Sequence, residues 1–531
     1  MSLSAGNSPG PWTRTVARPA DVCIIVEGCY PFVPGGVSGW IDWLIRSQPS
    51  TSFSIVSLWP APSEHPPRYA MPANAVAFHP LYLQTFGAEP LQSARLPRSL
   101  PALSDALQTF VTQGGAGALA TLTSAIAGTQ RDMPLAQIFN SPVAWELVQG
   151  MYRDRMPYGS FLHYFWAWRA LLGGLFATLE FPLPEAKVYH TISTGYAGLL
   201  AARAAGETGR PVILTEHGIY TNERRIELLM ADWVADTIEK GLSLDDPRLD
   251  LRDMWIHAFE AYARTCYQAC DQVITLYEDN QKVQRLLGAA APQCRVIANG
   301  IDVERFAQLE LATDTDRLTM ALIGRVVPIK DVKAYITAAH ILRARIPELR
   351  AFVLGPVDED PDYTAECRQL VTTLGLDGCV QFTGSVNIAE YLPKIHVAVL
   401  TSLSESQPLT ILEAGAAGVP FVATNVGSCR EIIEGRSDEQ PPLGPGGFIT
   451  QVVAPAEIAT AVERLLRDPA LRQAYGATLQ KRVRAIYTSE RASKAYTDLY
   501  RDLRNRPSRP VRKPTSSNTE PSMWRRSWRQ A

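Results

Sequence analysis

Short apolar runs of strand length recur along the chain and alternate with helical patterns, and this restricts the possible folds more than any other feature. In the first half these runs lie at residues 21–27, 53–59, 188–190, 211–215, 272–277 and 295–298. A second series follows at residues 318–324, 351–355, 380–383, 397–401, 421–424 and 448–453. Strands that are buried on both faces of a parallel sheet have this continuous apolar character. The sequence therefore predicts an α/β protein with two Rossmann-like, doubly wound domains that face each other across a cleft.

The expected domain limits follow from this alternation and from composition. The 531 residues, 46% of them hydrophobic, suffice for two or three domains with their own cores. We expect a flexible N-terminus at 1–20, a first domain at 21–305 with an insertion at about 60–184, a second domain at 306–487, and a helix at 488–505 that crosses back to the first domain. Residues 506–531, which are basic and rich in Pro and Ser, are expected to be disordered. The net charge of −2 gives no sign of a nucleic-acid binder, and the N-terminus shows no apolar signal core.

The stretch from 401 to 418, TSLSESQPLTILEAGAAG, joins one of the apolar runs to a predicted helix. Pro408 suits the first position of that helix, because the N–H that it lacks has no partner there, and Ser404 or Ser406 can provide the cap. Glu405 then lies in the loop, and Glu413 lies about a turn and a half into the helix.

The start of this helix is a predicted anion site. In a doubly wound sheet the junction lies at the carboxyl end of a strand, where free N–H groups near Leu409 and Thr410 attract a phosphate. Glu405 and Glu413 would repel a phosphate, so the hydroxyl groups of a ribose or a hexose suit them better. The combination indicates a nucleotide sugar. Alternatively, Glu405 is a solvated loop acid and Glu413 a surface residue of the helix.

Two segments of the first half carry further candidate residues. The loop from 28 to 39 contains Gly35 and Gly36, which let backbone N–H groups approach a phosphate or sugar closely, although such a pair is also typical of a plain turn. His217 directly follows a predicted strand, so it lies at the edge where open α/β sheets place their sites. A structural histidine with satisfied hydrogen bonds is the alternative.

The second half resembles the retaining glycosyltransferases of family 4, in motifs that together cover nearly all of residues 270 to 435. Two glutamates separated by seven residues are typical of that family, and Glu405 and Glu413 have this spacing. Further matches, in order, are the segments 298–302 with Phe306, 324–331, 382–385, and 418–424 with Gly427. The resemblance implies the two-domain architecture called GT-B, a UDP-sugar donor bound without a metal ion or another cofactor, and retention of anomeric configuration.

The resemblance also implies which residues contact the donor: Gly35, Gly36, Gly324, Arg325, Lys330, Ser385, Val386, Asn387, Glu405, Leu409, Thr410 and Glu413. Arg325 and Lys330 would hold the diphosphate, and Glu413 would bind the ribose. Glu405 would bind the sugar hydroxyls, and His217 would line the reacting centre. The segment 385–387 would read the base through its backbone. The chain departs from the family at one place. Many family members have a small residue after the first glutamate, whereas this chain has Pro408, which has no N–H to offer to the nucleotide sugar.

In the first half, the segments 26–31, 35–38 and 215–225 resemble members of the family that build exopolysaccharides. This implies transfer of a hexose or N-acetylhexosamine to a growing polysaccharide acceptor, in the cytoplasm or at the periphery of the inner membrane. Inner-membrane proteins of polysaccharide synthesis and export are the implied partners. Two alternatives stay open: a catalytically silent nucleotide-sugar-binding subunit of such a complex, and another GT-B enzyme such as a UDP-sugar epimerase.

Three segments have competing interpretations. Residues 158–169, YGSFLHYFWAWR, form either an aromatic platform for a glycan or part of the core. The segment 358–362, DEDPD, contains the D-x-D pattern of metal-dependent transferases, but a solvated acidic loop agrees better with the metal-free resemblance. In the basic tail, Trp524 and Trp528 stand among arginines, and this tail either touches anionic lipid or a partner, or is simply solvated.

Overall fold

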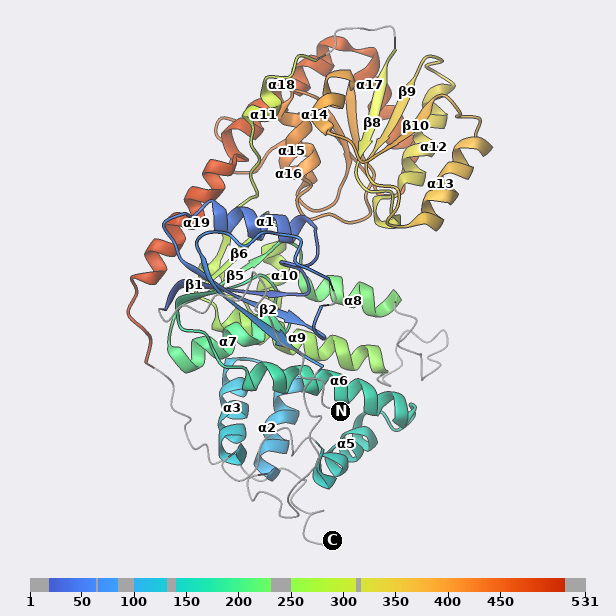
Figure 1. Ribbon diagram of the computed structural model, residues 1–531. Coiled ribbons are helices and arrows are strands. Elements are labelled where there is room, and N and C mark those ends of the chain that lie inside the picture. Colours follow the sequence, from blue (N-terminus) through green and yellow to red (C-terminus); the bar gives the residue numbers. More distant parts are fainter. Residues whose placement is uncertain are drawn as a thin grey trace, which may run out of the picture.

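The computed structural model describes residues 19–63, 65–84, 100–130, 140–230, 250–311 and 317–510. These residues form two α/β domains, one above the other in Figure 1. Each domain contains one parallel sheet covered by helices, so the prediction of two Rossmann-like domains is confirmed. Residues 1–18 of the predicted N-terminal extension and 511–531 of the basic tail lie outside the described residues. Two ends of these predictions were wrong: Ala20 is already part of a strand, and Arg509 donates its N–H to the carbonyl of Gly209 at 2.8 Å.

The N-terminal domain is built on a seven-stranded sheet with the order β3-β2-β1-β4-β5-β6-β7. Its strands are β1 (Ala20–Glu27), β2 (Phe53–Trp59), β3 (Ala75–Tyr82), β4 (Ala186–Thr191), β5 (Val212–Glu216), β6 (Gln272–Thr275) and β7 (Cys294–Val296). The helices beside them are α1 (Gly36–Arg46), α7 (Tyr196–Thr208), α8 (Tyr220–Met230), α9 (Leu251–Ala269) and α10 (Asn280–Leu286). Buried apolar clusters lie on both faces of this sheet, which explains its continuous apolar strands.

Strand β3 was not predicted, because the region after residue 60 was read as insertion. The strand pairs in parallel with β2 and forms the edge of the sheet. It contains Pro80, which has no N–H to donate and is therefore tolerated at an edge but not in the middle of a sheet. The inserted helices follow it: α2 (Leu100–Gln113), α3 (Ala116–Gln130), α5 (Pro142–Arg155) and α6 (Phe161–Glu180). Figure 1 shows them at the end of the N-terminal domain that is remote from the C-terminal domain.

The C-terminal domain has a six-stranded sheet with the order β10-β9-β8-β11-β12-β13. Its strands are β8 (Thr319–Ile323), β9 (Arg350–Leu354), β10 (Val380–Gly384), β11 (Val397–Leu400), β12 (Phe421–Thr424) and β13 (Gly447–Thr450). Its helices are α12 (Val332–Arg343), α13 (Pro361–Thr373), α14 (Ile388–Tyr391), α15 (Leu409–Ala416), α16 (Cys429–Glu434), α17 (Pro455–Arg467) and α18 (Pro469–Ile486). The short helix α11 (Glu304–Ala307) lies at the entry to this domain. Figure 1 shows α15 and α16 opposite α1 of the N-terminal domain.

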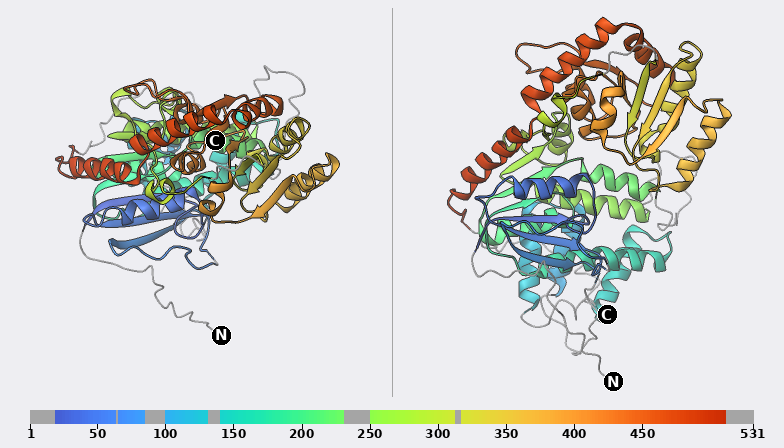
Figure 2. Two further views of the ribbon diagram at one scale, coloured as in Figure 1. Left: turned by 90° about the horizontal axis from the view of Figure 1, so that it is seen from above. Right: turned by 45° about the horizontal axis from the view of Figure 1, so that its top comes forward.

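The chain passes between the domains twice, and the two passages are bonded to each other. Ile301 donates its backbone N–H to the carbonyl of Tyr487 at 3.0 Å, and Ser489 donates to the carbonyl of Ile301 at 2.9 Å. Gly300 lies so close to the backbone of Thr488 that a Cβ atom would overlap it. The second passage continues into α19 (Ser489–Arg504), which runs along the flank of the N-terminal domain (Figure 2).

Helix α19 is held to the N-terminal domain by polar contacts within an apolar interface. The Tyr500 hydroxyl is hydrogen-bonded to Nδ1 of the buried His190 at 2.7 Å. The Gln48 amide donates to the carbonyl of Ser493 at 2.9 Å. Because His190 lies on β4, this last helix of the chain is part of the core of the first domain.

Candidate functional site

The loop between β11 and α15 contains Glu405, Glu413 lies within α15, and the start of this helix differs from the prediction. Helix α15 begins at Leu409, so Pro408 occupies the N-cap position and is not the first helical residue. Neither predicted serine caps the helix: no side chain does so, and the buried Ser406 hydroxyl has no partner among the described residues. The extended conformation of Pro408 delays the helix by one residue. As a result, no side chain in the described ranges accepts a hydrogen bond from the first N–H groups of α15. An anion site at a helix start requires N–H groups in this state.

Lys330 and Glu405 come together from segments 75 residues apart. The Lys330 ammonium forms an ion pair with the Glu405 carboxylate, and the Ser402 hydroxyl donates to the same carboxylate oxygen at 2.6 Å. Both charged side chains are largely buried, with 20% and 13% of their surface exposed. The Thr401 hydroxyl donates to the carbonyl of Lys330 at 2.7 Å and so joins the two segments. Ser402 was missed in the sequence, although its position directly after a strand was a usable signal.

Arg325 lies at the carboxyl end of β8 and is more exposed. Its guanidinium pairs with Glu359 at 2.7 Å, and both side chains are partly in solvent. Asp360 caps α13 by accepting a hydrogen bond from the N–H of Tyr363 at 2.9 Å. The D-x-D pattern thus supplies an ion pair and a helix cap. Across the described residues, no three or more His, Cys, Asp and Glu side chains are grouped so that they could hold a metal ion.

Glu413 lies about one turn into α15. Burial raises the pKa of its carboxyl to about 7, and the positive charge of Arg305 only partly opposes this effect. Within the described residues its carboxylate accepts no hydrogen bond. A half-buried carboxyl without a partner is an unusual feature of a helix start, and its site is suited to a ligand that carries hydroxyl groups.

The other predicted donor contacts of this domain have local structural roles as well. Asn387 caps α14 by accepting from the N–H of Ala389 at 3.3 Å, and it also accepts from Arg305 at 3.3 Å. Ser385 is exposed, and Val386 packs against the apolar core of the domain. The segment 385–387 therefore lies on the same side of the domain as Arg305, which approaches Glu413.

Gly427 shapes the loop from the opposite side. Its φ is +51°, and a Cβ atom there would overlap the carbonyl oxygens of Glu405 and Ser406. The next residue, Ser428, donates its N–H to the Ser406 carbonyl at 2.8 Å. A residue without a side chain is therefore required where the turn before α16 rests on the loop of Glu405.

The N-terminal domain contributes His217, directly after β5. Its ring packs edge-on against Trp40 of α1, with ring centroids 4.5 Å apart. Burial lowers the pKa of His217 to about 4, and its Nε2 atom is buried without a partner among the described residues. His190 differs in that both of its ring nitrogens are hydrogen-bonded. The place of His217 at a reacting centre stays a prediction.

Gly35 and Gly36 form the start of α1, the helix that carries Trp40. Nothing lies within 4 Å of the place where a Cβ atom of either glycine would stand. No side chain caps this helix start. The structure thus leaves space beside both glycines, and the binding of a phosphate or sugar there stays a prediction.

Two carboxylates at the carboxyl ends of β1 and β5 were not singled out in the sequence. Glu27, the last residue of β1, accepts from the Tyr220 hydroxyl at 2.8 Å and from the N–H of Ala197 at 3.1 Å. Glu216 is buried, which raises its pKa to about 7, and it accepts from Tyr267 at 2.7 Å. Their only sequence signal was their position at strand ends.

The two domains are in direct contact beside the loop of Glu405 and at helix α16. The Gln407 side chain accepts from the N–H of Asn299 at 2.7 Å, so the loop of Glu405 is tied to the passage between the domains. The N–H of Glu278 donates to Glu431 of α16 at 2.9 Å.

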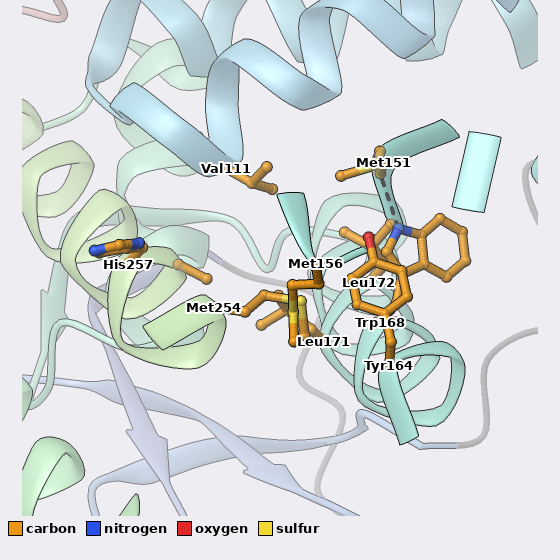
Figure 3. A pocket seen from close by; sticks show the side chains of 10 residues that line it. Val111, Met151, Met156, Tyr164, Trp168, Leu171, Leu172, Met254 and His257 are labelled. Carbon is orange, nitrogen blue, oxygen red and sulfur yellow. Dashed lines mark hydrogen bonds between the residues drawn. The ribbon is translucent and has the colours of Figure 1, made fainter. Parts of the chain in front are cut away.

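A separate apolar cavity of about 40 Å³ lies in the inserted region, between α2, α5, α6 and α9 (Figure 3). Its walls include Met151, Met156, Tyr164, Trp168 and Met254. It is far too small for a nucleotide sugar and contains none of the predicted site residues. None of the helices in the described ranges is long and apolar enough to cross a bilayer.

Two parallel Rossmann-like sheets define the GT-B class of fold, and comparison with solved structures agrees. Anabaena HepE in complex with UDP has a TM-score of 0.54 at 15% identity, over 91% of this chain and 100% of that one. The sucrose-phosphate synthase of Thermosynechococcus elongatus has a TM-score of 0.54 at 17% identity, over 91% and 98%. At these identities the similarity establishes the fold.

Two family models match the chain. Residues 20–292 match the family described as a domain of unknown function, DUF3492, and residues 304–482 match glycosyl transferases group 1. The first match spans just over half of the chain, which therefore belongs to the DUF3492 family, with a group 1 glycosyltransferase domain as its second half.

Curated relatives match more locally. The D-inositol 3-phosphate glycosyltransferase 2 of Catenulispora acidiphila is 29% identical over 208 residues, which are 36% of this chain and 47% of the relative. The D-inositol 3-phosphate glycosyltransferase of Streptomyces avermitilis is 26% identical over 250 residues, 44% of this chain and 52% of the relative. The chain thus spans about half the length of these relatives.

Proposed function

We propose that this chain is a retaining glycosyltransferase that transfers a hexose or N-acetylhexosamine from a UDP-sugar to a growing exopolysaccharide. The observation that carries the proposal is the junction of β11 and α15. An uncapped helix start, a largely buried lysine and a carboxyl without a hydrogen bond among the described residues belong to this junction, at the carboxyl edge of a parallel sheet. These groups match the diphosphate and the hydroxyl groups of a nucleotide sugar.

Each group has a distinct task in this proposal. Lys330, Arg325 and the first N–H groups of α15 stabilise the negative charge that develops on the departing diphosphate, which a metal ion would otherwise do. Lys330 must leave Glu405 to do so, and Glu405 then binds hydroxyl groups of the donor sugar. Glu413 accepts the ribose hydroxyls. His217, neutral at pH 7, offers its free ring nitrogen to the sugar beside the reacting carbon.

The acceptor and the cellular setting rest on resemblance alone. Segments 26–31, 35–38 and 215–225 resemble PelF, the glycosyltransferase of Pel exopolysaccharide synthesis. On this basis we propose a cytoplasmic protein that works with inner-membrane proteins of polysaccharide synthesis and export. The curated relatives act on a different acceptor by name, a D-inositol 3-phosphate, so acceptor identity requires its own experiment.

Calorimetric titration of the purified chain with UDP, GDP and ADP, without added metal, tests the donor site. We expect selective binding of UDP, followed by turnover with one of its sugar nucleotides. Lys333→Ala is a matched control for Lys330→Ala, because Lys333 lies three residues away and pairs with Glu366 on the surface. Absence of binding to all three diphosphates would contradict the proposal. Binding of UDP without turnover of any UDP-sugar in the presence of polysaccharide would instead indicate a catalytically silent subunit.

A further inference from the structure

We propose that the α5–α6 end of the N-terminal domain docks onto a membrane surface that contains anionic lipid. Four large apolar side chains, here called the α5–α6 patch, are exposed there: Trp145 (45%), Tyr158 (70%), Leu162 (61%) and Trp166 (58%). Scattered single hydrophobic residues on a surface need no explanation, but four of this size on two consecutive helices and their turn do.

Aromatic packing joins the two helices of the α5–α6 patch. Leu162 and Trp166 are one turn apart on α6, and Trp145 of α5 packs edge-on against Phe161 and Phe165, with ring centroids 5.4 and 5.6 Å apart. The opposite face of α6 is buried and lines the apolar cavity through Tyr164 and Trp168 (Figure 3). Helix α6 thus has apolar side chains on two faces, and only one of them is covered by the protein.

The second observation concerns Arg509, near the start of the basic tail. Arg509 donates its N–H to the carbonyl of Gly209 at 2.8 Å, and its side chain pairs with Asp271. Gly209 ends α7, which packs against α6: Arg203 of α7 donates to the carbonyl of Thr178 at 3.0 Å. Residues 511–531 follow this anchor and contain five basic residues, one acidic residue, and two tryptophans. A chain of that length spans up to about 70 Å, and α6 is only about 30 Å long.

The two features together favour a membrane over a protein partner. Tryptophan and tyrosine prefer the boundary between lipid and water, and clustered arginines are attracted to anionic headgroups. Figure 1 places the α5–α6 turn at the outer edge of the domain, away from the C-terminal domain. Docking there would leave α1 and α15 (Figure 1), which carry parts of the proposed donor site, away from the membrane. The proposal is independent of glycosyl transfer, because none of its residues belongs to the proposed donor site.

Flotation of the full chain with phosphatidylcholine vesicles, with and without phosphatidylglycerol, tests the proposal. We expect binding to the anionic vesicles that weakens as salt is raised. The double variant Leu162→Ser, Trp166→Ser should bind about tenfold more weakly. Arg525→Gln, Arg526→Gln, Arg529→Gln should also bind about tenfold more weakly. Leu286→Ser, which changes a residue that is 84% exposed on α10, is the control and should bind like the parent.

Calorimetry with UDP on the same variants separates this proposal from the proposed function, since neither set of substitutions touches the donor site. The membrane proposal is overturned if the parent does not float with anionic vesicles. It is equally overturned if the parent floats but the patch variant floats just as well, in which case the α5–α6 patch is not the contact and a protein partner becomes the explanation for its exposure.

Discussion

At the scale of residues, substitutions of Lys330 and of Glu405 should have different effects on the affinity for UDP. Lys330→Ala should weaken UDP binding by about tenfold or more, because a charged hydrogen bond to the diphosphate is lost and Glu405 is left to repel it. Glu405→Gln should leave UDP binding unchanged or strengthen it severalfold, because Lys330 no longer has to leave a carboxylate, while sugar transfer is lost. Calorimetry with UDP and a turnover assay check both. Equal weakening by the two variants would contradict the competition between carboxylate and diphosphate.

Glu413 should make the protein sensitive to pH near neutrality. Its pKa is about 7 in the folded chain and near 4.5 when unfolded, so the folded state binds more protons, and stability should fall as pH rises from about 4.5 to about 7. The affinity for UDP should rise with pH instead, because the ionised carboxylate accepts hydrogen bonds from the ribose hydroxyls best.

The matched variant Glu413→Gln isolates these effects from the titration of UDP itself and of Glu216. It should bind UDP about tenfold more weakly at high pH and lose the part of the pH dependence that belongs to residue 413. Urea unfolding and calorimetry at about pH 6 and about pH 8 measure both quantities. If parent and variant show the same pH dependence, Glu413 does not titrate in this range.

At the scale of elements, the turn before α16 controls the loop of Glu405. Gly427→Ala introduces a side chain at a positive φ and into contact with the carbonyls of Glu405 and Ser406. We expect a loss of about 1–3 kcal/mol of stability together with weaker UDP binding, since the loop has to move. Gly375→Ala is the control, because its φ is also positive, +65°, but its Cβ would meet nothing within 4 Å. If both variants bind UDP like the parent, the turn does not position the loop.

At the scale of the whole molecule, the last helix belongs to the first domain. Tyr500→Phe removes a hydroxyl and leaves Nδ1 of His190 buried without a partner, which should cost about 1–3 kcal/mol. Because Lys330 and Glu413, the proposed diphosphate and ribose contacts, lie in the other domain, UDP binding should not change. Urea unfolding followed by tryptophan fluorescence, with calorimetry on the same protein, checks this. A variant of parental stability would show that the hydrogen bond between Tyr500 and His190 contributes little to the N-terminal domain.

Much of the fold could be predicted, and the misses have identifiable causes. The continuous apolar runs determined both sheets, because only buried parallel strands combine that composition with intervening helices. The edge strand Ala75–Tyr82 was missed because an edge is less constrained and tolerates Pro80. The start of α15 was misplaced by one residue, since the φ of a proline, −72° here, suits both the cap and the first helical position, and only ψ distinguishes them.

The sequence by itself determined where a site could be, because strand ends, helix starts and glycine-rich turns are local features. It placed Lys330, Glu405, Glu413 and His217 at such positions. Only the tertiary structure decided their state: that Lys330 pairs with Glu405, that partial burial raises the pKa of Glu413, and that Nε2 of His217 is buried beside Trp40 without a partner in the described part of the chain. These properties depend on contacts and desolvation between segments far apart in the chain, which no local pattern encodes.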